Sequence, residues 1–158
     1  MISGFAKSGK PHEAHRLFQE IQVEKLRLDV ISWTSILSGY TKSGNANKAF
    51  EIWCQMRQSG IQLDPFSITA ALKACTESGT LGSGREIHGF SITYGLEKTP
   101  FVKAGLITMY FNCGTIKEAV SLFESAPCDI SLIWNAMISG YVKQGHGKLA
   151  LSFPKNAK

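Results

Sequence analysis

Apolar side chains recur along this chain with the spacing of helices, three or four residues apart. The pattern is clearest in two runs, Trp33, Ile36, Leu37 and Tyr40, followed by Ala49, Ile52, Trp53 and Met56. Both runs match positions i, i+3, i+4 and i+7, which predicts two helices that each bury one face. Gly44 lies between them, where a helix can end in a left-handed residue, and Asn45 or Asn47 can cap the next helix. The chain is therefore expected to form helical hairpins.

The hairpin pattern repeats along the chain. Glycines recur at intervals of 35, 35, 35 and 31 residues, at Gly9, Gly44, Gly79, Gly114 and Gly145. A small residue follows each glycine by five positions, as Ala14, Ala49, Gly84, Ala119 and Ala150. Two short helices cannot bury their apolar faces alone, so successive hairpins must stack and share a core. The sequence predicts an all-α fold, a right-handed superhelical solenoid of stacked helix-turn-helix repeats with about ten short helices.

The repeat units are expected within a single solenoid over 1–158. Their boundaries are placed at 1–29, 30–64, 65–99, 100–130 and 131–158, with the first and last units incomplete. Met1 aligns with Met137, which lies seven residues into the last unit, so the first helix is expected to lack its beginning. The chain is therefore interpreted as a fragment of a longer repeat protein.

Composition and charge narrow the classes of function. With 158 residues, 44% of them hydrophobic and 18% charged, the chain can bury a core and is not expected to be disordered. Lys and Arg number 17 against 12 Asp and Glu, and the net charge of +5 favours an anionic partner. No run approaches the roughly 18 apolar residues that span a bilayer, so no membrane partner is expected. The first residues show neither a signal-peptide nor a transit-peptide pattern.

The sequence offers no motif of a catalytic or metal site. The four cysteines form no C-x-x-C pair, since they stand at Cys54, Cys75, Cys113 and Cys128. His12 and His15 have H-x-x-H spacing rather than the H-E-x-x-H of zinc hydrolases, and the glycine-rich run 79–84 lacks the G-K-[ST] ending of a P-loop. The H-x-E and C-x-x-C signature of zinc deaminases is also missing. We therefore expect a protein that is not an enzyme, with no cofactor, metal or small-molecule substrate.

Several phrases resemble the pentatricopeptide repeat proteins of land plants, whose 35-residue period includes occasional 31-residue units. The run from Trp134 to Tyr141, WNAMISGY, is one such phrase. Leu72–Cys75 together with Gly84–Gly89 resembles the long-type unit of that family. The segment from Met109 to Pro127 resembles its short type. This mixed order is similar to the plant subclass associated with organelle RNA editing.

The resemblance implies that the stacked first helices read single-stranded RNA, with one unit for each base. In the family, the second residue of a unit packs against the bases, and these residues here are Ile31, Phe66, Phe101 and Leu132. The fifth and last residues together select the base by hydrogen bonding to its edge. The polar residues at those places are Thr34, Asp64, Asn135, Asp29, Thr69 and Thr99. By resemblance, the complete pair Thr34 and Asp64 prefers guanine, whereas Ala104 with Ile130 has no polar edge reader.

Three lysines occupy equivalent places two residues before their glycines, namely Lys7, Lys42 and Lys143. Stacking would set them in a basic stripe near the RNA backbone. Each assigned role has a structural alternative. The apolar second residues can be core or helix-entry staples, Thr34 or Asp29 can cap a helix, and lysines suit the dipole at a helix C-terminus.

The sequence as a whole predicts a noncatalytic, sequence-selective single-stranded RNA-binding solenoid. The resemblance also implies a role in organelle RNA editing or processing, in a mitochondrion or chloroplast, with editing or processing proteins supplied in trans. A tetratricopeptide-like protein-binding scaffold is an alternative, although its glycine after the third apolar residue of the first helix is replaced here by Leu37, Leu72, Ile107 and Ile138. A degenerate fragment without independent activity is another.

Overall fold

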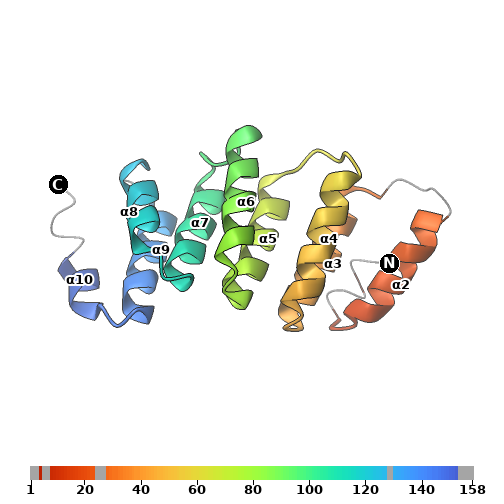
Figure 1. Ribbon diagram of the computed structural model, residues 1–158, viewed down its shortest axis with the longest axis horizontal. Helices are drawn as coiled ribbons and strands as arrows, with labels where there is room; N and C mark the ends of the chain where they lie inside the picture. Colours follow the sequence, from red (N-terminus) through yellow and green to blue (C-terminus); the bar gives the residue numbers. More distant parts are fainter. Residues whose placement is uncertain (1–3, 5–7, 24–27, 128–129, 153–158) are drawn as a thin grey trace. The chain divides into compact units, whose positions relative to one another are not determined.

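The computed structural model describes residues 4, 8–23, 28–127 and 130–152 (Figure 1). Among these residues the regular secondary structure is helical, with nine α-helices and no strand. The all-α class predicted from the sequence is therefore confirmed. The chain divides into two compact parts, an N-terminal part, 1–78, and a C-terminal part, 79–158, and each is described by itself.

The N-terminal part contains four helices. They are α2 (Pro11–Val23), α3 (Val30–Lys42), α4 (Ala46–Gln58) and α5 (Pro65–Ser78). Helix α3 packs against all three of the others, and α4 also packs against α5. The first helices of two successive hairpins, α3 and α5, are therefore neighbours, which brings equivalent positions of adjacent units close together.

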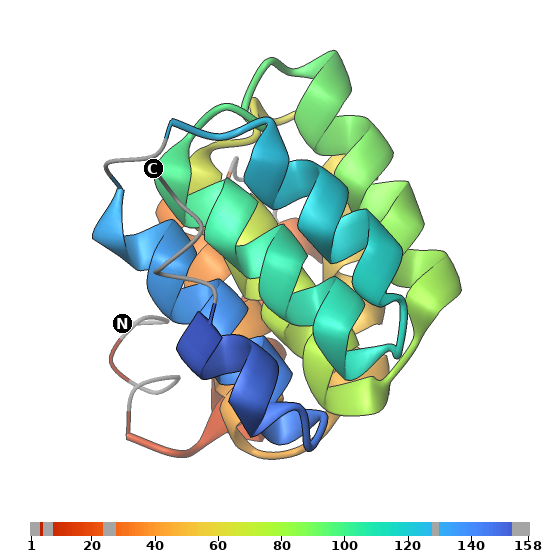
Figure 2. The ribbon, with the colours of Figure 1, turned by 90° about the vertical axis from the view of Figure 1, so that its left-hand side faces the viewer.

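The C-terminal part contains five helices. They are α6 (Leu81–Thr93), α7 (Pro100–Asn112), α8 (Ile116–Glu124), α9 (Ser131–Lys143) and α10 (Gly147–Ser152). Helix α7 packs against α6, α8 and α9, and α9 packs against α8 and α10. Figure 2 shows α7 beside α8 and α10 beside α9. As in the N-terminal part, the first helices of successive hairpins, here α7 and α9, pack side by side.

The turn between α3 and α4 shows how the sequence ends one helix and begins the next. Gly44 has φ +75°, a left-handed conformation that costs glycine little. The N–H of Asn45 donates to the carbonyl of Tyr40 at 3.0 Å, so this carbonyl at the end of α3 has a backbone partner from beyond the helix. The Asn45 side chain accepts from the N–H of Lys48 at 3.2 Å. Of the two asparagines that the sequence offered as caps, Asn45 is the one used.

The residues that carried the helical pattern form the core. In α3, Trp33, Ile36, Leu37 and Tyr40 are at most 2% exposed, and in α4 the residues Ala49, Ile52, Trp53 and Met56 are fully buried. Trp33 packs edge-on against Phe18 of α2, with ring centroids 4.3 Å apart. Burial of these side chains contributes about 1.5–3 kcal/mol each for a Val, Leu, Ile, Phe or Met. The helical periodicity therefore identified the buried faces of α3 and α4 correctly.

Within the described part of the chain, no helix has the length and apolar character needed to cross a membrane. The same residues hold no group of three or more His, Cys, Asp and Glu side chains placed to bind a metal ion. The interior of both parts is instead built from the stacking faces of short helices.

Candidate nucleic-acid interface

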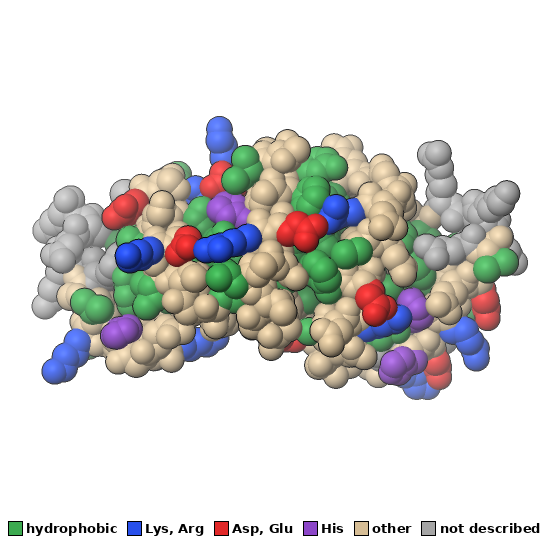
Figure 3. Space-filling model, in the orientation of Figure 1, with side chains coloured by type: hydrophobic (Ala, Val, Ile, Leu, Met, Phe, Trp, Pro, Cys, Tyr) green, Lys and Arg blue, Asp and Glu red, His purple; other side chains and the backbone are tan. Residues whose placement is uncertain are grey.

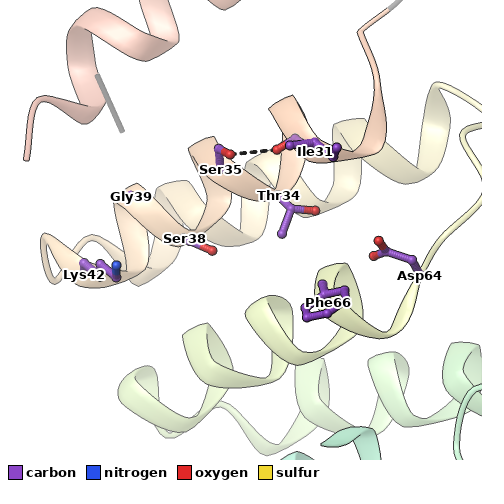
Figure 4. A pocket seen from close by; sticks show the side chains of 8 residues that line it. All are labelled: Ile31, Thr34, Ser35, Ser38, Gly39, Lys42, Asp64 and Phe66. Atoms are coloured by element: carbon purple, nitrogen blue, oxygen red, sulfur yellow. Dashed lines mark hydrogen bonds between the residues drawn. The ribbon is translucent and has the colours of Figure 1, made fainter. Parts of the chain in front are cut away.

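The N-terminal part has a cavity of about 340 Å³ between α3 and the beginning of α5 (Figure 4). We call it the Thr34 cavity. Its lining comprises Ile31, Thr34, Ser35, Ser38, Gly39, Lys42, Asp64 and Phe66. Helix α3 supplies residues from successive turns of one face, and Asp64 and Phe66 flank the start of α5. The packing of α3 against α5 therefore builds one site from two neighbouring units.

Five residues assigned from the sequence line this cavity: Ile31, Thr34, Lys42, Asp64 and Phe66. Three further lining residues, Ser35, Ser38 and Gly39, had no assigned role. A signal for Ser38 was present in the sequence, because it lies four residues after Thr34 and four before Lys42. Residues at that spacing share one face of a helix. Thr34 and Lys42, which had assigned roles, therefore already indicated the face of α3 on which Ser38 lies.

Thr34 presents an unusual hydroxyl. Its Oγ1 is buried and has no hydrogen-bond partner among the described residues. By contrast, Thr69, at the same place in α5, donates to the carbonyl of Pro65 at 2.6 Å. A buried polar group left without a partner costs about 1–3 kcal/mol. A ligand that hydrogen-bonds to Thr34 would remove this cost.

Asp64 is held firmly at the beginning of α5 by Ser67. The N–H of Ser67 donates to Asp64 Oδ1 at 2.7 Å, and the N–H of Asp64 donates to Ser67 Oγ at 3.1 Å. The Ser67 hydroxyl in turn donates to the Asp64 carbonyl at 2.8 Å, and Ser67 is fully buried. This reciprocal cap fixes the carboxylate and leaves Oδ2 without a hydrogen bond to any described residue. Asp64 can therefore cap α5 and still accept a bond from a ligand.

Asp29 has the equivalent capping role on α3. Its carboxylate accepts from the N–H of Ser32 at 2.9 Å, and this backbone hydrogen bond lowers the pKa of Asp29. The capping alternative is thus correct for Asp29. It is wrong for Thr34, which lies inside α3 and makes no such bond. The structure does not place Asp29 in the Thr34 cavity.

The apolar second residues are mostly on the surface. Ile31 is 65% exposed, Phe66 is 72% exposed and Phe101 is 61% exposed, whereas Leu132 is half-buried. The core-packing alternative is therefore wrong for the first three residues. Ile31 and Phe66 border the Thr34 cavity, so they give it apolar walls beside its polar lining (Figure 4). Phe101 and Leu132 belong to α7 and α9 in the C-terminal part.

The remaining assigned residues lie outside this cavity. Asn135 is exposed on α9, and Thr99 precedes α7 without capping it through its side chain. Thr69 and Thr99 belong to different parts of the chain. Lys143 is exposed in the last turn of α9, as Lys42 is in the last turn of α3, so both also suit the helix dipole. Lys7 lies outside the described residues.

Charge is arranged differently in the cavity and on the face shown in Figure 3. That face carries basic and acidic side chains close to one another in both parts. Ion pairs join Lys48 to Glu51 at 2.6 Å and Arg85 to Glu118 at 3.0 Å. In the Thr34 cavity, by contrast, Asp64 and Lys42 lie toward opposite ends (Figure 4). A ligand along α3 would therefore meet a hydrogen-bond acceptor at one end and a cation at the other.

A second polar cluster lies in the C-terminal part. His88 Nδ1 and the Tyr110 hydroxyl share a hydrogen bond of 2.8 Å, and His88 Nε2 lies 3.9 Å from a Glu97 carboxylate oxygen. Burial lowers the pKa of His88, while the nearby Glu97 carboxylate acts in the opposite direction. Burial also raises the pKa of Tyr110. The cluster is therefore expected to be uncharged at His88 and Tyr110 near neutral pH.

The fold and the Thr34 cavity define a helical-repeat protein whose first helices present a row of polar and apolar side chains. Known families agree with this class. The PPR repeat family model matches residues 28–77, and the PPR repeat model matches residues 1–26 and 132–153. These matches together cover more than half of the chain. The chain belongs to the pentatricopeptide repeat family.

Related plant proteins support this assignment. A pentatricopeptide repeat-containing protein of Arabidopsis thaliana is 34% identical over 155 residues, which are 97% of this chain and 22% of the relative. Another from the same plant, described as chloroplastic, is 36% identical over 64 residues, or 40% of this chain and 8% of the relative. A third, described as mitochondrial, is 37% identical over 71 residues, or 45% of this chain and 9% of the relative. The chain thus spans less than a quarter of each of these relatives.

Solved structures show the same fold. The pentatricopeptide repeat protein PPR10, crystallised in complex with an 18-nt psaJ RNA element, matches 97% of this chain with a TM-score of 0.73 and 15% identity. A crystal structure of PPR10 from maize matches 98% of this chain with a TM-score of 0.72 and 18% identity. This chain covers 24% and 23% of those chains, respectively. The likeness confirms the predicted solenoid class of stacked helical hairpins.

Proposed function

We propose that this chain is a noncatalytic segment that binds single-stranded RNA and that the Thr34 cavity selects one base, guanine. The observation that carries the proposal is the buried, unpartnered hydroxyl of Thr34 in a cavity that also contains a fixed carboxylate and two exposed apolar walls. A single-stranded base has the matching features, a polar edge and two apolar faces.

The polar groups favour guanine for a chemical reason. An ionised carboxylate only accepts hydrogen bonds, so Asp64 suits a base edge that has adjacent donors. Guanine offers two, N1–H and the N2 amino group, next to the acceptor O6. The hydroxyl of Thr34 can donate to that acceptor, and Oδ2 of Asp64 is not used by the cap of α5. Ile31 and Phe66 would contact the faces of the base.

Other units would extend the interface with less selectivity. Phe101 and Leu132 are proposed to stack on bases, and Lys42, Lys143 and Lys7 to contact the RNA backbone. Asn135, Asp29, Thr69 and Thr99 are proposed to contact base edges. These assignments rest on the repeat register. Ala104 with Ile130 supplies no polar group, so that unit would contribute stacking alone.

The cellular role proposed for the RNA-binding segment is in RNA editing or processing inside a mitochondrion or chloroplast. Support comes from relatives that are described as chloroplastic and as mitochondrial. This segment carries no catalytic motif, so the chemistry is proposed to come from editing or processing proteins supplied in trans or from a part of the protein outside this segment. The proposal therefore treats this segment as a reader of RNA sequence.

The test compares binding of short single-stranded RNAs that differ at one nucleotide, measured by fluorescence anisotropy. The wild-type chain is expected to prefer guanine at that position by about tenfold, within the 1–3 kcal/mol range of a good base contact. The variant Thr34→Ala with Asp64→Ala should lose the preference and keep its helical circular dichroism. A matched control, Thr93→Ala with Glu124→Ala, removes one hydroxyl and one carboxylate from α6 and α8, outside the cavity.

The outcomes separate the competing functions. Retention of the guanine preference by Thr34→Ala with Asp64→Ala would show that another site selects the base. Binding of an acidic peptide without any binding of RNA would instead support the protein-binding scaffold. The control variant should keep the guanine preference of the wild type. It changes the net charge by the same amount as the cavity variant does, but it leaves the cavity intact.

A further inference from the structure

Ser38 lies in the middle of the Thr34 cavity and has no structural role there. Its side chain borders the cavity, and its hydroxyl makes no hydrogen bond to another described residue (Figure 4). Helical serines and threonines commonly donate to the carbonyl four residues earlier. Within α3, Ser35 donates to Ile31 at 2.8 Å and Thr41 donates to Leu37 at 2.9 Å. Ser38 differs from both because its hydroxyl is left for a ligand.

The equivalent place in α7 shows the usual arrangement. Thr108 stands there, and its hydroxyl donates to the carbonyl of Ala104 at 2.9 Å. The same α7 unit lacks a polar residue at the place of Thr34. The free hydroxyl of Ser38 therefore occurs beside the polar pair Thr34 and Asp64, and the bonded hydroxyl occurs where that pair is missing.

Three side chains follow one another along α3 in a definite chemical order. Thr34, Ser38 and Lys42 are four residues apart, which corresponds to steps of about 6 Å along a helix. Asp64 lies near the Thr34 end, and the Lys42 amine gives the other end a positive charge (Figure 4). A nucleotide has a matching order, with a hydrogen-bonding base, a neutral ribose and an anionic phosphate. If the base is at Thr34, the sugar comes next to Ser38.

We propose that Ser38 hydrogen-bonds to the 2′-hydroxyl of the nucleotide whose base occupies the Thr34 cavity, so that this cavity selects ribose over deoxyribose. The inference rests on the proposed function, because it requires the base to lie between Thr34 and Asp64. Neither of the other contacts can distinguish the two sugars, since guanine and phosphate are common to RNA and DNA. A hydroxyl donates and accepts, as the 2′-hydroxyl does, and that group is what marks RNA.

The test uses two RNAs of identical sequence, one of which carries a single 2′-deoxyguanosine at the selected position. Wild-type protein should bind the all-ribose strand about twofold to tenfold more tightly, the range for one neutral hydrogen bond. Ser38→Ala should bind both strands with the same affinity, equal to that of the wild type for the deoxy strand. Alanine favours a helix more than serine does, so the variant is expected to fold.

Ser43→Ala is the matched control. Its hydroxyl donates to the carbonyl of Tyr40 at 2.9 Å at the end of α3, and it does not line the cavity. This variant should keep the wild-type ratio between the two strands. The control therefore separates a contact to ribose from a general effect of removing a hydroxyl from this helix.

Two results would overturn the proposal. An unchanged ratio in Ser38→Ala would show that this hydroxyl does not read the sugar, and an equal loss of affinity for both strands would place its contact on the base or phosphate. In either case the guanine preference of the wild type would persist, so the proposed function would stand. If the wild type bound no RNA, both the proposed function and this inference would fail.

Discussion

Helices α3 and α7 are first helices of two repeat units with the same fold and different surface chemistry. Both are 13 residues long, and each is followed by a glycine with positive φ, +75° at Gly44 and +77° at Gly114. Both expose a large apolar residue, Ile31 or Phe101, at the second position. At the fifth position, however, α3 has the unpaired hydroxyl of Thr34 where α7 has the buried methyl group of Ala104.

The difference shows that the hairpin does not require the polar residues that can bind a ligand, although one of them, Asp64, also caps α5. The fold needs the buried helical stripe and the glycine at the turn, and both units have them. It does not need a polar group at the fifth or last position, so these vary between units without loss of the hairpin. A unit can therefore preserve the scaffold and lose base selection.

The interiors of the two units also differ. The fourth residue is Trp33 in α3 and Lys103 in α7, and both are buried. Trp33 packs against Phe18, whereas the Lys103 amine donates to Ser125 Oγ at 3.0 Å. A lysine can place its aliphatic stem in an apolar interior when its amine reaches a polar partner at the edge. The fourth position of a unit therefore requires a long side chain that can be buried, and it accepts both an aromatic and a basic residue.

The largest expected effect is a loss of stability, and it should distinguish two aromatic residues of the N-terminal part that differ in burial. Trp53→Ala should lower the free energy of unfolding by about 3–5 kcal/mol, because Trp53 is fully buried and its removal leaves a cavity. Phe66→Ala should change it by less than about 0.5 kcal/mol, since Phe66 lies on the surface. Urea unfolding followed by circular dichroism measures both.

For RNA binding by folded protein, the order of the two variants should be reversed, with the larger effect in Phe66→Ala. Phe66→Ala is expected to weaken RNA binding by about 1–3 kcal/mol, the contribution of one stacked base. If Phe66→Ala lost much stability, or if it bound RNA as tightly as the wild type, Phe66 would not be a residue that contacts RNA without stabilising the fold.

A graft of the missing pair onto the α7 unit should produce a smaller effect. Ala104→Thr with Ile130→Asp is expected to add a preference for guanine at a second nucleotide, within about 1–3 kcal/mol of discrimination. The fold should tolerate both changes. Threonine already occupies this place in α3, as Thr34, and in α5, as Thr69, and Ile130 precedes α9 without a side-chain cap, a place that favours aspartate.

Anisotropy titration of the graft with RNAs that carry one or two guanines measures the gain. The single variant Ile130→Asp is the control, because it adds the helix cap without completing the pair. If the graft folds and shows no new preference, the fifth and last positions alone do not select the base.

Much of this arrangement could be predicted from the sequence because it follows from periodic patterns. The 35-residue spacing of glycines and the apolar stripes gave the hairpins and the buried faces of α3 and α4. The same register placed Thr34 and Asp64 at the fifth and last positions of one unit, and the structure brings both to one cavity. The choice between Asn45 and Asn47 as the cap of α4 required the actual backbone, since both residue types and positions were suitable.

Side-chain hydrogen bonding could not be predicted in the same way. Whether a hydroxyl donates to its own helix or remains free depends on its rotamer and neighbours. The sequence therefore did not show that Ser35 donates to Ile31 while the Ser38 hydroxyl stays free. The burial of Lys103 depends on Ser125, which is 22 residues away and has no periodic relation to it. Such contacts come from tertiary packing, which a repeat pattern does not specify.

The smallest expected effect concerns the His88 cluster of the C-terminal part. Burial holds the pKa of His88 below its ordinary value of 6.5, so the unfolded chain binds a proton more readily than the folded chain does. The resulting stability is present above about pH 6.5 and declines as the pH falls through the lower folded pKa. His88→Gln should therefore reduce the loss of unfolding free energy between about pH 7 and pH 5, measured by urea titration at each pH.

His15 in the N-terminal part also has a pKa lowered mainly by burial. The variant His15→Gln therefore tests how far this histidine makes the free energy of unfolding depend on pH. If His88→Gln leaves the pH dependence unchanged while His15→Gln removes it, acid sensitivity belongs to the part that carries the Thr34 cavity, and RNA binding should weaken over the same pH range.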